Sequence, residues 1–378
     1  MFGARLTFSA VAALGLMGLG LTGCLQTAPP ELVQAIDDLD RQLVEAQGAV
    51  YAPEDYARFA SQWASVKARM AAEADAIQWP WEPNTLVAEL NRVQAQGEQA
   101  LVTAAQRQST EREEAAQRVA HVEQRLQLLA SNLDSMGSRV VLGQQPVEAD
   151  LLVKQARRLL DQGLYGRARQ VSDRASASLD TQIRHLVAEL GHYADETRVQ
   201  NWRRMVRETV AWSRQHQASA IIVNKADRRL LLYRNGRLAQ TYSVSLGYNG
   251  IREKRYQGDG ATPEGQYRIV KKKNRGDTAF HRALLLDYPN AEDQRRFRLA
   301  QLAGTLPAHA FIGGQIEVHG QPHAAATETL GCMMVANQHM DTIFAAMKEG
   351  DPVTIVGAME LTNPVAITLA ELEQTQEG

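Results

Sequence analysis

Cysteine is the rarest residue in this chain of 378 residues, which contains only Cys24 and Cys332. Two cysteines exclude a disulfide framework and a multi-cysteine metal cluster, so each of them needs its own explanation. The chain also lacks an excess of either charge, since 41 basic and 43 acidic side chains give a net charge of −2. This balance argues against nucleic acid as a partner. Beyond the N-terminus there is no long apolar run, which excludes a polytopic membrane protein.

The single apolar run lies at the N-terminus, where Arg5 precedes an uncharged stretch over residues 6–21. This stretch is shorter than the ~20 residues that span a bilayer and is typical of a secretory signal. The run ends in the sequence L-T-G-C, with Cys24 last. This ending resembles a bacterial lipoprotein signal, which implies removal of residues 1–23 and lipidation of Cys24. An ordinary signal peptide with a chance cysteine is the alternative.

Lipid chains on Cys24 would hold the protein at a membrane surface. The next residue is Leu25 rather than an acidic residue, which resembles the sorting pattern for the outer membrane in Gram-negative lipoproteins. We therefore expect a lipid anchor at the periplasmic face of the outer membrane, in preference to the inner membrane, with residues 24–30 as a tether.

Residues 31–217 are rich in alanine, glutamine, glutamate, leucine and arginine, which predicts an α-helical bundle or coiled-coil region. Apolar residues at steps of three and four place one stripe along 86–104 and another along 119–133. Gly97 is a weak point in the first stripe. The polar stretch 106–114 between the two stripes predicts an interruption of the helix.

Residues 151–161 and 165–190 predict a helix–turn–helix pair, and no fixed-period repeat is present. The simplest interpretation of the helical region is a stalk that holds the following domain away from the membrane, because apolar stripes usually form a core. A partner-binding or wall-spanning spacer is the alternative.

From about Ala218 the sequence favours a mostly β domain over 218–357, followed by a C-terminal tail over 358–378. Asn235-Gly236 predicts a two-residue hairpin turn, because both residues accept positive φ angles. The predicted strands are 220–223, 230–233, 241–246, 265–270, 283–286, 315–318 and 353–356.

The second cysteine lies in this β domain. Cys332 follows Gly331, and His319 ends a predicted strand upstream of it. A cysteine with a histidine is the minimum set for a thiolate nucleophile and its base. A glycine before the nucleophile permits a sharp turn, and backbone amides there can stabilise an oxyanion. A buried, inert cysteine is the alternative.

A zinc site formed by His319, His323 and Cys332 is a further alternative. Gly320 and Pro322 argue against a helix that would align the two histidines.

Several short motifs accompany the His/Cys pair. They are G-D-G-A-T-P-E-G at 258–265, F-H at 280–281, Y-P-N-A-E-D at 288–293, and I-E-V-H-G at 316–320 followed by T-L-G-C at 329–332. In this order and spacing they resemble the YkuD-type L,D-transpeptidase family of bacterial cell-wall enzymes. The resemblance covers residues 218–357 and leaves out the helical region and the N-terminal signal.

The resemblance implies roles for individual residues. Cys332 would be the nucleophile and His319 the base, with the backbone carbonyl of Gly320 orienting the imidazole. Thr329 and Gly331 would belong to the loop whose amides stabilise the oxyanion. The T-P-E-G segment favours a structural turn beside the site, and neither a metal nor another cofactor is implied.

The contacts with substrate are less defined. His281, His323 and Tyr288 are the candidate substrate-binding residues. Two positions depart from the family pattern, because Leu330 stands where many members have a second histidine and Met334 where an arginine or a small residue is common. These departures leave open whether an amine or water resolves the thioester.

The resemblance implies peptidoglycan stem peptides as substrate, with Cys332 attacking the carbonyl at the L-centre of diaminopimelate. Transfer to an amine would form a cross-link or attach a protein to the wall. Transfer to water would give L,D-carboxypeptidase or amidase activity. A protein without catalytic activity, which would act as a scaffold between outer membrane and wall, is the alternative to an enzyme. An envelope protein is a candidate partner of the helical region. Catalysis is favoured by a second observation, since an unpaired thiol is a liability in an oxidising compartment.

Overall fold

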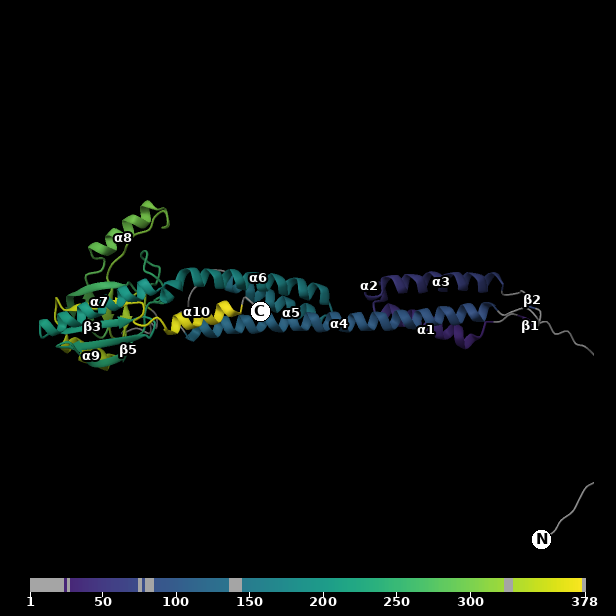
Figure 1. Ribbon diagram of the computed structural model, residues 1–378, viewed down its shortest axis with the longest axis horizontal. Helices are drawn as coiled ribbons and strands as arrows, with labels where there is room; N and C mark the ends of the chain where they lie inside the picture. Colours follow the sequence, from purple (N-terminus) through teal and green to yellow (C-terminus); the bar gives the residue numbers. More distant parts are fainter. Residues whose placement is uncertain are drawn as a thin grey trace, which may run out of the picture. The chain divides into compact units, whose positions relative to one another are not determined.

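The computed structural model divides the chain into two compact units, Met1–Glu114 and Ala115–Gly378 (Figure 1). The residues it describes are 24–25, 28–73, 77–78, 85–135, 145–322 and 329–375. The predicted signal peptide, residues 1–23, lies outside the described residues. None of the helices within the described ranges is both long enough and apolar enough to cross a membrane.

The first unit is helical. Its elements are α1 (Pro30–Glu45), α2 (Gly48–Tyr51), α3 (Pro53–Ala72) and the first part of α4 (Thr85–Ser135). Buried side chains from three of these helices, including Ile36, Phe59, Trp63 and Leu90, form its core. Part of the predicted tether is the short strand β1 (Cys24–Leu25), which pairs antiparallel with β2 (Ile77–Gln78).

The weak point expected at Gly97 has a packing role. A Cβ atom at this position would lie 2.8 Å from Cε2 of Phe59. The absence of a side chain at Gly97 therefore lets the aromatic ring of α3 pack closely against the backbone of α4. The lower helix propensity of glycine is offset by this close contact.

The predicted interruption at 106–114 is wrong, because α4 runs through these residues without a break. Seven of the nine residues in this stretch are glutamine, arginine or glutamate, which are good helix formers, so a polar stretch does not end a helix unless it also contains a breaker. The polar stretch instead coincides with the division between the two units at Glu114.

The helices of the second unit include the predicted helix–turn–helix pair, which is confirmed as α5 (Gln145–Asp161) packed on α6 (Tyr165–Leu190). The short 3₁₀ helix η1 (Gly191–Ala194) and α7 (Glu196–Gln215) follow. The predicted C-terminal tail contains α10 (Pro364–Gln374), which packs against α6 and η1. Its buried residues Val365, Leu369 and Leu372 belong to the hydrophobic core of the second unit.

The mostly β domain expected from the sequence is confirmed as an eight-stranded sheet in the order β5-β4-β3-β10-β6-β7-β8-β9. Most neighbours are antiparallel, whereas β3 pairs parallel with β10 and β8 pairs parallel with β9. The strands are β3 (Ser219–Asn224), β4 (Arg229–Arg234), β5 (Arg237–Ser243), β6 (Gly265–Lys273), β7 (Ala283–Leu286), β8 (Glu317–His319), β9 (Met333–Met334) and β10 (Pro352–Val356).

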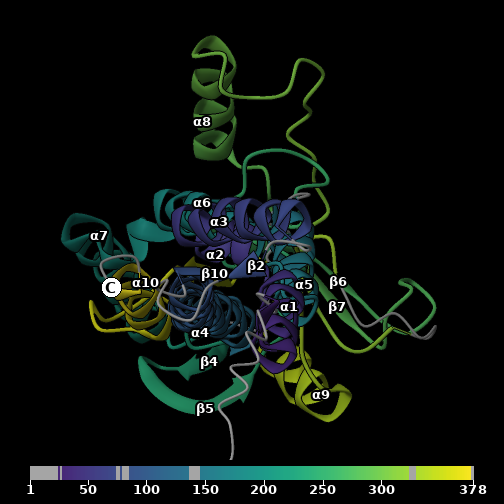
Figure 2. The same ribbon diagram turned by 90° about the vertical axis from the view of Figure 1, so that its right-hand side faces the viewer.

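The predicted hairpin turn is confirmed, since Asn235 and Gly236 have φ angles of 50° and 75° between the paired ends of β4 and β5. Two helices interrupt the later strands. The helix α8 (Ala291–Leu302) stands away from the sheet in both views (Figures 1 and 2), and α9 (Asn337–Ala346) follows β9.

Helix α7 covers the sheet at β3 and β10. Trp202 of α7 is buried so closely against Gly357 that a Cβ there would lie 2.3 Å from the indole ring. The hydroxyl groups of Thr209 on α7 and Thr354 on β10 lie 2.5 Å apart. Helices α5, α6, α7, α9 and α10 therefore share one hydrophobic core with the sheet.

Candidate active site

The parallel pairing of β8 with β9 brings the two expected catalytic residues close to each other, one on β8 and one just before β9. Val318 pairs with Met333 and His319 with Met334, so Cys332 lies just before β9 at the same edge of the sheet. Both His319 and Cys332 line one pocket with a volume of about 530 Å³. The other lining residues are Lys254, Gln257, Gly258, Phe280, Gly313, Gly314, Gln315, Ile316, Glu317, Pro322, Thr329, Leu330 and Met334.

The imidazole of His319 is fully buried and held in one orientation. Its Nδ1 atom donates a hydrogen bond to the carbonyl oxygen of Gly320 at 2.6 Å. The ring of Phe280 stacks on it, with centroids 3.6 Å apart and planes 16° apart. With the proton on Nδ1, the lone pair of Nε2 is free, and this atom has no hydrogen-bond partner among the described residues.

Burial lowers the pKa of His319 below its usual value of 6.5, and the Gly320 hydrogen bond opposes this shift. The imidazole is therefore neutral at pH 7. A neutral, oriented ring with an unpartnered Nε2 is suited to accept a proton.

Cys332 is a free cysteine in the structure. Its Sγ atom donates a hydrogen bond to the carbonyl oxygen of Gln315 at 3.5 Å. Burial raises the pKa of this thiol from 9.0 to about 11, and a hydrogen bond with the backbone of Glu317 acts in the opposite direction. The thiol is therefore protonated in the resting site, and a base must remove its proton before it can act as a nucleophile.

The loop before Cys332 depends on glycine. Gly331 has a φ angle of 132°, and a Cβ there would lie 2.6 Å from the carbonyl oxygen of Ala261. The side chain of Thr329 donates a hydrogen bond to the carbonyl oxygen of Cys332 at 2.7 Å, and the Thr329 carbonyl accepts one from the amide of Tyr248 at 3.0 Å. These contacts fix the backbone around the candidate nucleophile.

The T-P-E-G segment at 262–265 follows Ala261, whose carbonyl lies against Gly331. Glu264 is buried and accepts a hydrogen bond from Nζ of the fully buried Lys225 at 2.8 Å. The same ammonium group donates to the carbonyl oxygens of Arg252 and Thr262. This arrangement holds the chain from 252 to 264 against the sheet, which fits the structural interpretation of the segment.

The predicted substrate-binding residues do not meet at the Cys332 pocket. His281 is buried, and its two ring nitrogens contact Arg275 at 2.9 Å and Asp341 at 2.7 Å. It is not among the described residues that line the pocket. His323 lies outside the described residues.

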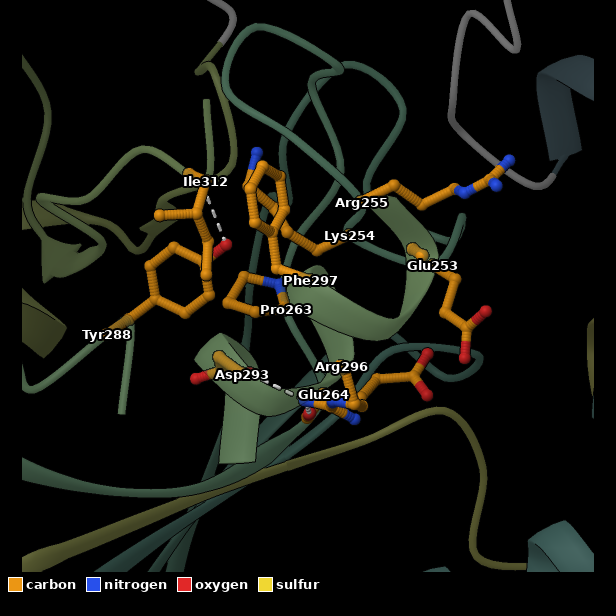
Figure 3. Close-up of a pocket in the computed structure, with 11 residues that line it drawn as sticks. Glu253, Lys254, Arg255, Pro263, Glu264, Tyr288, Asp293, Arg296, Phe297 and Ile312 are labelled. Atoms are coloured by element: carbon orange, nitrogen blue, oxygen red, sulfur yellow. Dashed lines mark hydrogen bonds and ion pairs between the residues drawn. The ribbon is translucent and has the colours of Figure 1, made fainter. Parts of the chain in front are cut away.

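Tyr288 lines a different pocket, of about 220 Å³, together with Pro263, Phe297 and Arg296 (Figure 3). Its hydroxyl donates a hydrogen bond to the carbonyl oxygen of Ile312 at 3.2 Å, as the dashed line in Figure 3 marks. The structure thus places Tyr288 beside α8.

Sequence reasoning missed several residues that shape the site. The backbone carbonyl of Gln315 accepts the hydrogen bond of the thiol. Phe280 stacks on the base, and sequence reasoning noted the F-H motif that contains it but gave Phe280 no role. Lys254 forms one wall, where Asp259 holds its ammonium group at 2.6 Å. Since these residues lie 17 or more positions from Cys332 in sequence, only the fold brings them together.

No cluster of three or more histidine, cysteine, aspartate or glutamate side chains suited to a metal ion occurs in the described ranges. One member of the zinc set considered above, His323, lies outside them.

Among curated proteins, the chain is 27% identical over 128 residues to YafK of Escherichia coli strain K12, and equally to YafK of strain O157:H7. The matched region is 33% of this chain and 45% of each relative, so the chain spans less than half the length of these relatives.

Among solved structures, Bd1075 of Bdellovibrio bacteriovorus is 19% identical, with 43% of this chain and 57% of that chain covered and a TM-score of 0.30. L,D-transpeptidase 1 of Mycobacterium tuberculosis is 18% identical, with 37% and 62% covered and a TM-score of 0.23. The model of the YkuD family, described as the L,D-transpeptidase catalytic domain, matches residues 218–355. The resemblance expected from the sequence is thereby confirmed, since residues 218–355 match the model of the YkuD L,D-transpeptidase catalytic domain.

Proposed function

We propose that the chain is a cysteine-dependent L,D-transpeptidase that acts on peptidoglycan stem peptides. One observation carries the proposal: His319 and Cys332 line the same pocket within the region that matches the L,D-transpeptidase catalytic domain. The orientation of the imidazole by Gly320 supports the role of His319 as the base.

In the acylation step, Nε2 of His319 takes the proton of the Cys332 thiol, and Sγ attacks the carbonyl carbon at the L-centre of diaminopimelate. Backbone amides of the loop that contains Gly331 stabilise the oxyanion of the tetrahedral intermediate. The bond from carbon to nitrogen then breaks. The proton on Nε2 passes to the leaving amine, and a thioester remains on Sγ.

In the second step, an amine attacks the thioester carbon and loses a proton to His319 as the thiolate of Cys332 leaves. The proton returns to Sγ, and the product is a new amide. Water in place of the amine gives a carboxylate, so hydrolysis and transfer use the same groups and differ only in the acceptor.

The proposal places the protein at the periplasmic face of the outer membrane through a lipid on Cys24. The L-T-G-C sequence that ends at Cys24 and the following Leu25 support this location. The membrane anchor would bring the catalytic domain to the cell wall, where its substrate lies.

The test uses the full chain and its Cys332→Ala variant, each incubated with purified muropeptides in the presence and absence of an added amine. Mass spectrometry is expected to show the thioester on Cys332 and an amide product that the variant does not form. The matched control is His216→Gln, since His216 is exposed and remote in sequence from the pocket residues. A product that contains only new carboxylates would establish the hydrolytic alternative. Absence of both turnover and thioester would refute the proposed enzymatic activity and would favour the alternative of a non-catalytic scaffold between outer membrane and wall.

A further inference from the structure

The segment that follows His319 contains three consecutive peptide groups, and backbone hydrogen bonds fix the first of them. The carbonyl oxygen of His319 accepts a hydrogen bond from the amide of Val335 at 2.9 Å. The amide of Gly320 donates one to the carbonyl oxygen of Arg282 at 3.0 Å. Neighbouring segments on both sides therefore set the orientation of the peptide group between His319 and Gly320.

The third peptide group, between Gln321 and Pro322, is also held by the backbone. The carbonyl oxygen of Gln321 accepts a hydrogen bond from the amide of His281 at 3.0 Å. Proline has no amide hydrogen that needs a partner, and Pro322 forms an isolated β-bridge with Phe280. The two outer peptide groups of the segment are thus fixed by the chain around 280–282 and by Val335.

The middle peptide group, between Gly320 and Gln321, is bonded to a side chain at each end. Its carbonyl oxygen accepts the hydrogen bond from Nδ1 of His319 at 2.6 Å. Its amide donates to Oδ1 of Asn337 at 2.7 Å. Because a backbone amide can only donate, Asn337 must present its oxygen here rather than its amide nitrogen. Asn337 and His319 are therefore linked through one planar group.

The glycine at position 320 makes this link possible. A Cβ atom there would lie 2.7 Å from Oδ1 of Asn337 and 2.9 Å from Cβ of His281. The absence of a side chain lets the carboxamide of Asn337 approach the peptide group to hydrogen-bond distance. Glycine also accepts the widest range of backbone angles, so the middle peptide group could rotate between its fixed neighbours if nothing held its amide. Such a rotation would turn the carbonyl away from His319.

Asn337 can prevent this rotation because it belongs to a rigid element. It is the first residue of α9, which begins shortly after β9. The helix packs against β7, and its residues Met340, Ile343 and Phe344 are buried in the hydrophobic core. The position of Oδ1 is therefore set by the packing of α9, as the precise placement of a functional group requires.

We propose that Asn337 is a positioning residue of the candidate active site. Through the peptide group between Gly320 and Gln321, it keeps the Gly320 carbonyl directed at Nδ1 of His319. The proton of the imidazole then stays on Nδ1, and Nε2 is available as the base. The hydrogen bond to Asn337 also polarises the peptide group, which strengthens its carbonyl as an acceptor. The inference rests on the proposed function for the role of His319 as the base.

The first test measures the tautomer of His319 without turnover, by long-range proton–nitrogen NMR of the full chain with isotope-labelled histidine. His319→Gln identifies the resonances of this ring. The parent is expected to show one tautomer, with the proton on Nδ1, and Asn337→Ala a mixture of both. Asn337→Asp should restore the single tautomer, since a carboxylate oxygen accepts the same hydrogen bond. The matched control Gln338→Ala, which removes an exposed side chain one residue further along α9, should resemble the parent.

A single unchanged tautomer in Asn337→Ala would overturn the inference. A mixture of tautomers in Asn337→Asp would do the same, because this variant keeps the acceptor atom. Alanine is a good helix former, so Asn337→Ala is expected to retain α9.

The second test measures turnover of a stem tetrapeptide. Asn337→Ala is expected to lower kcat about tenfold, the scale of one lost hydrogen bond, and Asn337→Asp should recover most of this loss. KM should stay within about twofold, because Asn337 is not among the described residues that line the Cys332 pocket. Lower thermal stability of Asn337→Ala with unchanged kcat would show a purely structural role and overturn the inference. If the unaltered chain forms no thioester, the proposed function fails, whereas the tautomer measurement still decides whether Asn337 positions His319.

Discussion

The thiol of Cys332 should react slowly with an alkylating reagent at neutral pH, although it is the proposed nucleophile. Burial raises its pKa from 9.0 to about 11. A rise of about two units lowers the thiolate fraction at pH 7 about 100-fold relative to a cysteine with an ordinary pKa. Because a more basic thiolate is also more nucleophilic, by about 0.4–0.5 logarithmic units per pKa unit, the net rate should fall about tenfold.

The assay is the rate of iodoacetamide labelling of the Cys332 peptide in the folded full chain, followed by mass spectrometry from pH 6 to pH 10. The logarithm of the rate is expected to rise linearly with pH and to show no plateau in this range, since the pKa lies near 11. The same peptide in the unfolded chain provides the reference for an ordinary thiol. His319→Gln should leave this profile unchanged within about twofold, because Nε2 of His319 has no hydrogen-bond partner among the described residues in the resting site.

A plateau that begins near or below pH 8 would refute this reasoning, above all if His319→Gln removes it. Such a profile would mean that a thiolate–imidazolium pair already exists in the resting protein. In that case the hydrogen bond from Sγ to the Gln315 carbonyl would not describe the reactive state.

Three further predictions follow from the same geometry. Burial lowers the pKa of His319 from 6.5, so the base stays neutral at pH 7, and turnover should fall only as the pH drops below about 6.5; an acidic limb centred above pH 7 would contradict this. Lys225→Met leaves Glu264 buried without its partner and should lower the free energy of unfolding, measured with denaturant, by about 3–5 kcal/mol. The double variant with Glu264→Leu should recover much of this loss, because it removes the unpaired buried charge. Gly331→Ala places a Cβ 2.6 Å from the Ala261 carbonyl and should cost about 1–3 kcal/mol of stability and most of the turnover, whereas unchanged kcat would show that the loop adjusts.

The features that sequence reasoning predicted well depend on short-range chemistry. Asn235-Gly236 specifies its turn through the φ angles that these two residues accept, and the structure has both angles positive. His319 and Cys332 were proposed from their order and from the glycines next to them, and the structure places both in one pocket. In each case the signal lies within a few residues along the chain.

The features that sequence reasoning missed depend on contacts across the fold. Nothing near Lys225 indicates that its ammonium group will be buried against Glu264, 39 positions later. Tyr288 was expected at the substrate because of its motif, yet its hydroxyl bonds the Ile312 carbonyl in a separate pocket. Contacts of this kind join residues that are distant in sequence and form when the strands assemble. They cannot be predicted from composition or from the periodicity of apolar residues.

The change in composition and hydrophobic pattern at residue 218 marks a change from helices to strands rather than the edge of a folding unit. Trp202 on α7 is buried against Gly357, and Thr209 on the same helix contacts Thr354 of β10. A helix that covers one face of a sheet belongs to the core of that sheet, whatever its composition. The division that the structure does show lies at Glu114, inside a single continuous helix.

The helices of the second unit also help to build the candidate active site. The hydroxyl of Tyr193 in η1 donates a hydrogen bond to the carbonyl oxygen of Ile251 at 2.8 Å. Glu189 at the end of α6 pairs with Arg252 at 2.8 Å. Both contacts fix the start of the loop that carries Lys254, which lines the Cys332 pocket. A movement of α6 and η1 would therefore shift one wall of this pocket, so this helical segment acts as part of the catalytic scaffold and not only as a spacer.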